Sequence, residues 1–198
     1  MFTGIVRATG EIVEVEEKNA ARRLKIRAGL PLGNIEIGAS VACDGCCLTV
    51  VEKGADWLAF DAAAETLSKT NVGHWQKGTM VNIETSLRMG DEIGGHMVSG
   101  HVDGLATVES VARDGDAWRI KIRVPDNLAP YIAQKGSVTL NGISLRVNEV
   151  DGPVFGVCII PHTWAVTNIS QWQAGTKINL EVDMLARYVA RILGKEAA

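Results

Sequence analysis

The sequence predicts a mainly β protein built from two tandem copies of one small antiparallel barrel, followed by a single helix. Three observations indicate this fold class. The 198 residues contain an internal repeat, in which residues 40–50 recur as residues 137–147. Apolar and polar residues alternate with the period of two that a half-buried strand requires, and glycine recurs between these runs. Only the end of the chain shows helical spacing.

The repeat extends over nearly the whole chain, and it fixes the domain division. Residues 4–6 match residues 100–102. In the same register, Thr66, Thr70, Asn71, Gly78, Asn82 and Glu84 recur as Thr163, Thr167, Asn168, Gly175, Asn179 and Glu181. We therefore predict a first barrel in residues 1–93, a second barrel in residues 94–183 and a separate tail in residues 184–198.

Each copy contains strand and turn signals. Ile120 and Ile122 alternate with charged residues in the second copy, as Leu24 and Ile26 do in the first. The pairs at residues 44–45 (Asp-Gly) and 141–142 (Asn-Gly) separate apolar runs and tolerate the positive φ angles of a two-residue hairpin turn. A closed barrel leaves no exposed edge and is favoured, with a two-sheet sandwich as the alternative. Residues 65–73 and 162–170 are candidates for short helical turns.

The tail differs from both copies. Five apolar residues fall at helical spacing, with Asp183 as a plausible N-cap and Gly194 as a stop signal. They are Leu185, Tyr188, Val189, Ile192 and Leu193. An apolar helical face must be buried against something. We therefore expect a helix that belongs to neither barrel and packs its apolar face against another surface.

Composition narrows the class of function. The formal net charge of −3 offers no basic field for a phosphate backbone, so nucleic acid is an unexpected partner and a small molecule fits better. No apolar run has the length of a membrane span, and the first residues lack the regions of a signal peptide. We therefore expect a cytoplasmic protein whose four cysteines stay reduced.

Comparison with the second copy indicates different roles for the cysteines of the first hairpin. Cys43 and Cys46 form a C-x-x-C motif, which suggests zinc or redox chemistry, but Leu140 and Ile143 occupy the equivalent positions. Two small buried hydrophobes are the better interpretation. Cys47 lies on the other face of its strand and aligns with Ser144, so both are expected to point away from their own cores. An ordinary exposed thiol and hydroxyl are the alternative.

Two histidines lie in a glycine-rich entry to the second barrel. Imidazole side chains in general titrate near physiological pH, so His96 and His101 are candidates for proton transfer. Zinc binding is the rival interpretation, but no acidic companion stands at a usual ligand spacing. His162 replaces Glu65 of the first copy, and a plain surface residue is an equal alternative there. No P-loop, G-x-G-x-x-G sequence or nucleophile elbow is present, so no metal or phosphate-bearing cofactor is expected.

Four segments together resemble the riboflavin synthase family: MFTGIV at residues 1–6, DGCCLTV at 44–50, GGHMVSGHVDG at 94–104 and IPHT at 160–163. The resemblance covers essentially the whole chain. It implies two six-stranded antiparallel barrels of the Greek-key type, and a homotrimer whose site lies between the first barrel of one subunit and the second barrel of a neighbour. It further implies that the tail at residues 184–198 serves assembly of the trimer, and it implies association with lumazine synthase.

The activity implied by the resemblance is the dismutation of two molecules of 6,7-dimethyl-8-ribityllumazine into riboflavin and 5-amino-6-(D-ribitylamino)uracil, without a cofactor. A non-catalytic lumazine or flavin carrier, such as the antenna proteins of luminous bacteria, is the alternative on the same fold. Retention of Cys47, His96, His101 and Ser144 favours the enzyme, because a pure binder needs no such set. A flavin-reductase barrel would need a nicotinamide domain, for which no residues remain.

The resemblance also carries the site residues over. Cys47, His96, His101 and Ser144 are expected near the chemical steps, with their individual roles open. Arg146 departs from the family pattern, which usually has threonine there, as at Thr49. The ligand-lining residues of the first copy are Gly4, Ile5, Val6, Cys47, Leu48, Thr49, Asp61, Ala62, Ala63, Ala64, Glu65 and Thr66. Those of the second copy are Gly100, His101, Val102, Lys135, Ser144, Leu145, Arg146, Cys158, Ile159, Ile160, Pro161, His162 and Thr163.

Overall fold

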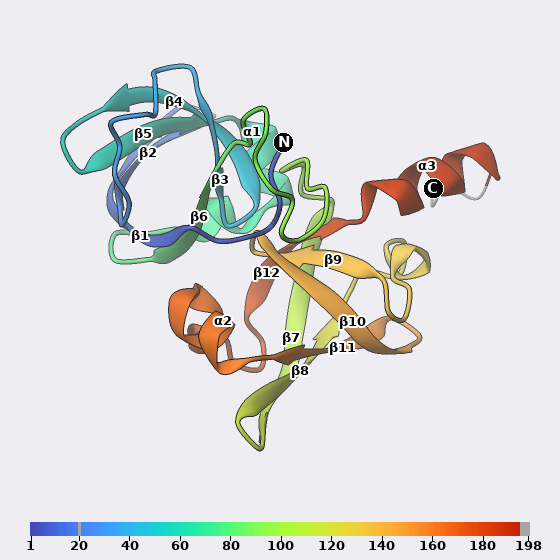
Figure 1. Ribbon diagram of the computed structural model, residues 1–198. Helices are drawn as coiled ribbons and strands as arrows, with labels where there is room; N and C mark the ends of the chain where they lie inside the picture. The colour runs from blue at the N-terminus through green and yellow to red at the C-terminus, as the bar shows by residue number, and fades with distance from the viewer. Residues whose placement is uncertain (20, 195–198) are drawn as a thin grey trace.

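The computed structural model describes residues 1–19 and 21–194, and it shows two closed antiparallel barrels and a C-terminal helix (Figure 1). The first barrel comprises β1 (Ala8–Lys18), β2 (Ala21–Ala28), β3 (Ser40–Cys43), β4 (Cys46–Lys53), β5 (Trp57–Ala62) and β6 (Met80–Thr85), with α1 (Ala64–Lys69) and the 3-10 helix η1 (Asn71–His74) between β5 and β6. The strand order around the barrel is β1-β2-β5-β4-β3-β6.

The second barrel repeats the six strands and the two helical segments of the first and adds a 3-10 helix between its second and third strands. It comprises β7 (Gly104–Asp114), β8 (Ala117–Arg123), β9 (Ser137–Leu140), β10 (Ile143–Asp151), β11 (Val154–Ile159) and β12 (Lys177–Val182), with η2 (Ala129–Tyr131), α2 (Pro161–Val166) and η3 (Asn168–Gln171). Its strand order is β7-β8-β11-β10-β9-β12. The six-stranded barrels are confirmed, and the sandwich alternative is wrong because each sheet closes on itself. The short helical segments are present in both copies.

The two central hairpins turn as predicted and meet back to back. Asp44 and Gly45 have φ angles of 45° and 76°, and Asn141 and Gly142 have 44° and 77°. A Cβ added at either glycine would lie 2.7 Å from the backbone nitrogen of the other glycine. Glycine is therefore required at both turns for their left-handed backbone and for the contact between the barrels.

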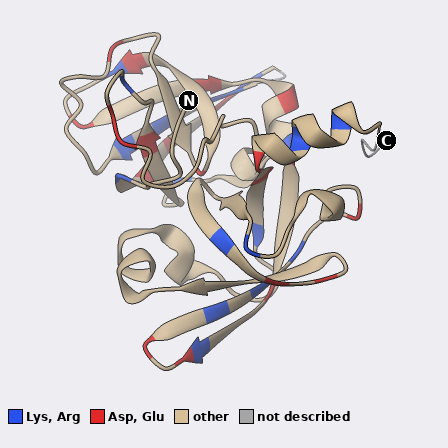
Figure 2. Ribbon diagram, turned by 45° about the vertical axis from the view of Figure 1, so that its right-hand side comes forward, with Lys and Arg blue, Asp and Glu red and all other residues tan. Residues whose placement is uncertain are grey.

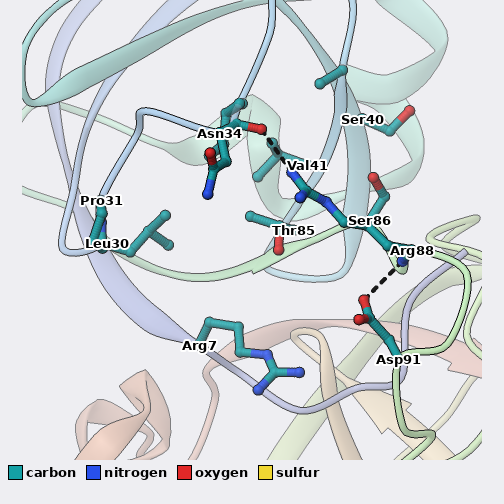
Figure 3. Close-up of a pocket in the computed structure, with 12 residues that line it drawn as sticks. Arg7, Leu30, Pro31, Asn34, Ser40, Val41, Thr85, Ser86, Arg88 and Asp91 are labelled. Atoms are coloured by element: carbon teal, nitrogen blue, oxygen red, sulfur yellow. Dashed lines mark hydrogen bonds between the residues drawn. The ribbon is translucent and has the colours of Figure 1, made fainter.

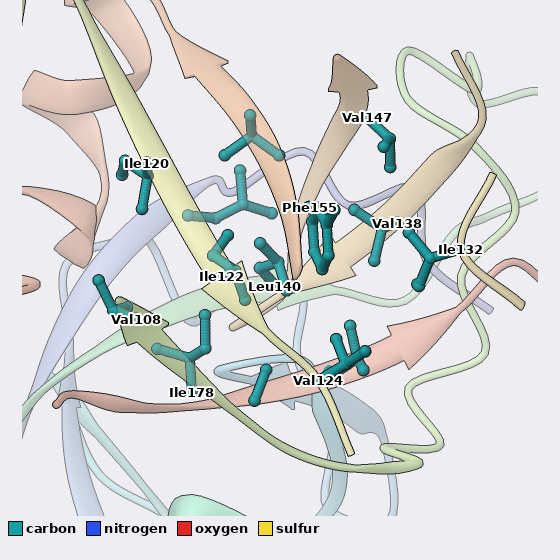
Figure 4. Packing of buried hydrophobic residues seen from close by; sticks show 14 of the residues in the cluster. Val108, Ile120, Ile122, Val124, Ile132, Val138, Leu140, Val147, Phe155 and Ile178 are labelled. Carbon is teal, nitrogen blue, oxygen red and sulfur yellow. The ribbon is translucent and has the colours of Figure 1, made fainter. Parts of the chain in front are cut away.

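Each barrel is filled by its inward-facing residues. Ile120 and Ile122 of β8 are fully buried, and they pack in the second core (Figure 4). In the first barrel, Cys43 and Cys46 are buried in the core. Burial raises the pKa of the Cys46 thiol to about 12. Both thiols therefore act as the small apolar core residues that the repeat predicted.

A buried network of amide side chains joins the two barrels. Asn82 Nδ2 donates to Asn168 Oδ1 and to the backbone oxygen of Asn141, both at 2.9 Å. The equivalent Asn179 Nδ2 donates to Asn71 Oδ1 (2.9 Å) and to the backbone oxygen of Asp44 (2.8 Å). Because every buried amide in this exchange has a partner in the opposite copy, the network specifies one relative orientation of the barrels.

Asp44 is the carboxylate of this network, whereas its equivalent in the second copy is Asn141. Burial raises the pKa of Asp44 to about 7. Hydrogen bonds from the Asn82 backbone (2.7 Å) and the Asn168 side chain (2.9 Å) oppose this rise only in part. The first copy thus has a carboxyl group at the position where the second copy has an uncharged amide of similar shape.

Replacing Asp44 with asparagine is expected to stabilise the protein increasingly as the pH rises. A carboxyl whose pKa is raised by folding contributes stability while it is protonated, and this contribution is lost between the usual pKa of 3.8 and about 7. The difference in unfolding free energy between variant and parent should therefore grow by about 4 kcal/mol across this window. Urea unfolding at pH 4, 6 and 8 measures it, with Asn141→Asp as the reverse control. A pH-independent difference would show that Asp44 titrates normally.

The helix α3 (Met184–Ile192) projects away from the barrels (Figure 1). Asp183 caps it by accepting a hydrogen bond from the backbone of Leu185 at 2.9 Å, and Arg187 Nη2 lies 3.1 Å from Asp103 Oδ2. The five apolar residues of the predicted stripe are 54% to 83% exposed. Residues 195–198 of the predicted tail lie outside the described residues. None of the helices in the described ranges has the length and apolar character of a membrane-spanning segment.

Candidate active site

The segment that precedes each barrel lies on the central hairpin of the other barrel. The backbone oxygen of Gly4 accepts a hydrogen bond from the backbone of Ser144 (2.8 Å), and Gly100 accepts one from Cys47 (2.9 Å). Residues 4–6 and residues 100–102 thus belong to the first and second copies in sequence, while Gly4 and Gly100 contact the hairpin of the other copy in space. A backbone bridge between Phe2 and Val98 joins the two segments side by side.

Two buried glutamates hold these segments in place. Glu84 Oε1 accepts from the backbone and the hydroxyl of Thr3, both at 2.7 Å, and its Oε2 accepts from the next N–H at 3.0 Å. Glu181 holds the backbone and hydroxyl of Ser99 in the same way, at 2.7 and 2.6 Å. Burial raises the pKa of both carboxyls, although these hydrogen bonds oppose it. The two glutamates therefore fix the positions of the segments that contain Thr3 and Ser99.

Beside Cys47, the crossing segment and the first barrel enclose a depression of about 240 Å³, the first-barrel depression. Gly100 has a φ of 79°, and a Cβ there would lie 2.7 Å from that of Cys47, so only glycine allows this approach. The lining residues are Cys46, Cys47, Glu65, Thr66, Lys69, Thr70, Gly100, His101 and Val102. Cys47 and His101, which come from different copies, therefore share one surface.

The other two candidates, His96 and Ser144, are in direct contact. His96 Nδ1 lies 2.7 Å from Ser144 Oγ, and Nε2 lies 3.1 Å from Thr139 Oγ1. Burial lowers the pKa of His96, while the carboxylate of Asp183 acts in the opposite direction. A neutral imidazole bonded to a hydroxyl is the arrangement that transfers protons to and from that hydroxyl.

The remaining predicted ligand-lining residues differ in how deeply their side chains are buried. Leu48, Ala62 and Ile159 are buried in the barrel cores, so they reach a ligand only through their backbone. Asp61 is engaged in a two-pronged ion pair with Arg23, at 2.8 Å for both bonds. The exposed lining candidates are Ile5, Thr49, Ala63, Ala64, Glu65, His101, Lys135, Arg146, Ile160, Pro161 and His162. Val6, Thr66, Val102, Leu145, Cys158 and Thr163 are half-buried.

Sequence reasoning did not single out the residues that support these pairs. Thr139 contacts His96, and Glu84 and Glu181 hold the crossing segments. The repeat could have indicated the two glutamates, because Glu84 recurs as Glu181 in an apolar strand of each copy, and a buried charge requires partners. The partners themselves were hidden, since Thr3 lies 81 positions away from Glu84.

A further pocket, of about 250 Å³, lies at one end of the first barrel, and none of the residues that line it is a predicted site residue (Figure 3). Arg7 extends toward it, and Arg88 donates to the backbone oxygen of Asn34 at 3.0 Å. In the second barrel, Asp103 stands at the position equivalent to Arg7 and is paired with Arg187 of α3. The residue equivalent to Arg7 thus contacts α3, whereas Arg7 itself lines the pocket.

Comparisons with known proteins agree with this architecture. A family model described as the lumazine binding domain matches residues 3–86 and 99–183. The crystal structure of LumP complexed with riboflavin has a TM-score of 0.86 at 26% identity, covering 92% of this chain and 100% of that chain. The LumP complex with 6,7-dimethyl-8-(1'-D-ribityl) lumazine has a TM-score of 0.83 at 25% identity, covering 92% and 99%. Fold and matched segments define a protein with two lumazine-binding barrels.

Sequence relatives narrow this class. The riboflavin synthase of Brucella abortus (strain 2308) is 47% identical over 197 residues, which cover 97% of this chain and 98% of that protein. The riboflavin synthase of Photobacterium phosphoreum is 42% identical over 98% of this chain and 89% of its own length. The chain belongs to the riboflavin synthase family.

Proposed function

We propose that this protein catalyses the dismutation of two molecules of 6,7-dimethyl-8-ribityllumazine to riboflavin and 5-amino-6-(D-ribitylamino)uracil. The observation that carries the proposal is the duplication of one arrangement. Each central hairpin presents a nucleophilic side chain, Cys47 or Ser144, beneath a glycine segment of the other copy. Two equivalent surfaces suit a reaction whose two substrates are the same molecule.

The residues at these surfaces suit the expected steps. The C7 methyl group of the lumazine is acidic because its anion is delocalised into the ring, and a neutral imidazole such as His96 can accept its proton. A thiol or hydroxyl can add at C7 of the other lumazine. Holding both rings in reacting geometry contributes about 7 to 11 kcal/mol to such a reaction.

Assembly belongs to the same proposal. Within one chain, the first-barrel depression and the His96–Ser144 pair belong to hairpins of different barrels. We propose a cytoplasmic homotrimer in which residues 1–93 of one subunit face residues 94–183 of a neighbour, and in which residues 184–198 carry assembly. The exposed apolar stripe of α3 supports this. Association with lumazine synthase is proposed on the family likeness.

The test of the function is direct. Purified protein mixed with 6,7-dimethyl-8-ribityllumazine should produce riboflavin absorbance and consume two lumazines for each riboflavin formed. A carrier is the second candidate, because the LumP structures contain the lumazine and riboflavin. Stoichiometric binding of the lumazine without riboflavin formation would favour the carrier.

Replacing Cys47 with alanine is expected to lower turnover at least tenfold and to leave the melting temperature nearly unchanged. Cys47 is half-buried at the depression, and a side chain at a partly exposed site contributes little to stability. The matched control is Cys46→Ala, which removes a thiol from the core one position away and should lower the melting temperature instead. Full activity of the Cys47→Ala variant would contradict a role for this residue in catalysis or ligand contact.

A further inference from the structure

The pocket at one end of the first barrel has an apolar side and a polar side (Figure 3). The apolar side is formed by the connection between β2 and β3 and by the start of β3, with Leu30, Pro31, Ile35, Ala39 and Val41. The polar side consists of Arg7, Asn34, Ser40, Thr85, Ser86, Arg88 and Asp91. Figure 3 shows the guanidinium of Arg7 and the hydroxyl of Thr85 on opposite sides of the same opening.

Three hydroxyls and one guanidinium of this pocket have no hydrogen-bond partner in the part of the chain that the structure describes. The hydroxyls are those of Ser40, Thr85 and Ser86, which are half-buried, and the guanidinium is that of Arg7. Glu84 lies within electrostatic reach, since burial raises its pKa and the charge of Arg7 is among the causes that oppose this rise. The carboxylate of Glu84 is already bonded to residues 3 and 4. The guanidinium of Arg7 therefore remains free to bind a ligand.

The charged residues that line the pocket leave an excess of positive charge. Arg88 donates through Nη2 to the backbone oxygen of Asn34 at 3.0 Å, and its backbone N–H donates to Asp91 Oδ2 at 2.8 Å. Two guanidinium groups thus face one carboxylate. Acidic and basic residues are interspersed over both barrels (Figure 2), so this excess is local to the pocket.

The second copy has different side chains at three of these polar positions. In the register of the repeat, the equivalent pairs are Arg7 and Asp103, Thr85 and Val182, and Ser86 and Asp183. Asp103 accepts hydrogen bonds from the backbone of Val182 at 2.8 Å and from Arg187 at 3.1 Å. Because the second barrel closes with carboxylates at two of these positions, closure of the fold does not require the cation and hydroxyls of the first.

The side chains of the pocket are those that recognise a phosphate group. A guanidinium offers parallel N–H donors that match phosphate oxygens, and hydroxyls can donate to the oxygens that remain. The volume of about 250 Å³ lies below the range of about 300 to 1,000 Å³ that is usual for larger organic ligands. A small anion therefore fits better than a flavin ring, and the apolar side can contact a short carbon chain attached to it.

We propose that this pocket is a binding site for the phosphate group of a small molecule, either inorganic phosphate or a short-chain phosphate ester. Arg7 binds the phosphate oxygens, and the hydroxyls of Ser40, Thr85 and Ser86 complete the site. No residue is shared between the lining of this pocket and that of the first-barrel depression. The inference is therefore independent of the proposed reaction of the lumazine.

Isothermal titration calorimetry of the full-length protein tests the site, in phosphate-free buffer at constant ionic strength. The probes are inorganic phosphate and, separately, glycerol 3-phosphate. We expect saturable binding of one molecule per chain. Tighter binding of glycerol 3-phosphate would identify a phosphate ester as the ligand, through contact of its carbon chain with the apolar side. Equal or weaker binding of the ester would identify inorganic phosphate. Absence of saturable binding of both probes would overturn the inference.

Arg7→Gln should weaken binding of the tighter probe about tenfold or more, because a hydrogen bond between charged groups is lost. Ser86→Ala leaves every charge in place and should weaken binding by a smaller factor. The matched control is Arg27→Gln, which removes an exposed cation of the same barrel that pairs with Glu11 at 3.0 Å, outside the pocket. It should bind as the parent protein does. Parental affinity in Arg7→Gln, or an equal loss in Arg27→Gln, would overturn the inference by showing that the attraction is not specific to this pocket.

Discussion

Replacement of His96 by alanine is expected to lower turnover of the lumazine by about a hundredfold or more, the usual contribution of a positioned acid or base. The imidazole is half-buried and bonded on both sides, to Ser144 and Thr139, so both ring nitrogens are held in a defined geometry. Because burial lowers its pKa, it remains neutral below the usual value of 6.5, and the acidic limb of the kcat/KM profile should lie below that pH. The limb should disappear in the variant.

His74→Ala is the matched control, because His74 is an exposed histidine of η1 outside the pair. It should retain activity and the parent pH profile. Thr139→Val tests positioning, since it removes the bond to Nε2 while leaving Ser144 in place. We expect it to lower kcat with a smaller effect on KM. A His96 variant with parental kcat and an unchanged acidic limb would place proton transfer elsewhere, with His101 as the next candidate.

A chain that ends at Asp183 is expected to sediment as a smaller species and to lose most of its turnover at dilute concentrations, while keeping its β-type circular dichroism. The helix α3 contributes an exposed apolar stripe and no strand to either barrel. An isolated helix of this length is marginal in water, so it gains stability from packing against another surface. If the site needs barrels from two subunits, loss of assembly removes activity.

The control chain ends at Gly194, which keeps the whole described helix and removes residues 195–198 only. It should behave as the full-length protein does. Sedimentation velocity at several concentrations, with turnover measured on the same samples, distinguishes the two truncations. A chain ending at Asp183 that remains fully assembled and active would show that α3 only caps its own barrel, where Arg187 contacts Asp103.

The sequence by itself determined the features that depend on local spacing. Strand alternation around Ile120, the two-residue turns, the N-cap at Asp183 and the burial of Cys43 and Cys46 all follow from neighbouring residues and from comparison of the two copies. Such features are readable because pleat, turn and helix geometry act over a few positions. Because the chain is duplicated, each of these patterns occurs twice, and comparison of the two copies distinguished Cys47 from the two core cysteines.

Only the tertiary structure decided which residues meet. The crossing of residues 4–6 to the second barrel and of residues 100–102 to the first depends on the bridge between them and on buried partners such as Glu84 and Glu181. No local pattern encodes such contacts, because Glu84 and Glu181 lie 81 and 82 positions from the residues that they hold. For the same reason the contact of His96 with Ser144 became visible only when the barrels were in place, since strand pairing and burial set this distance.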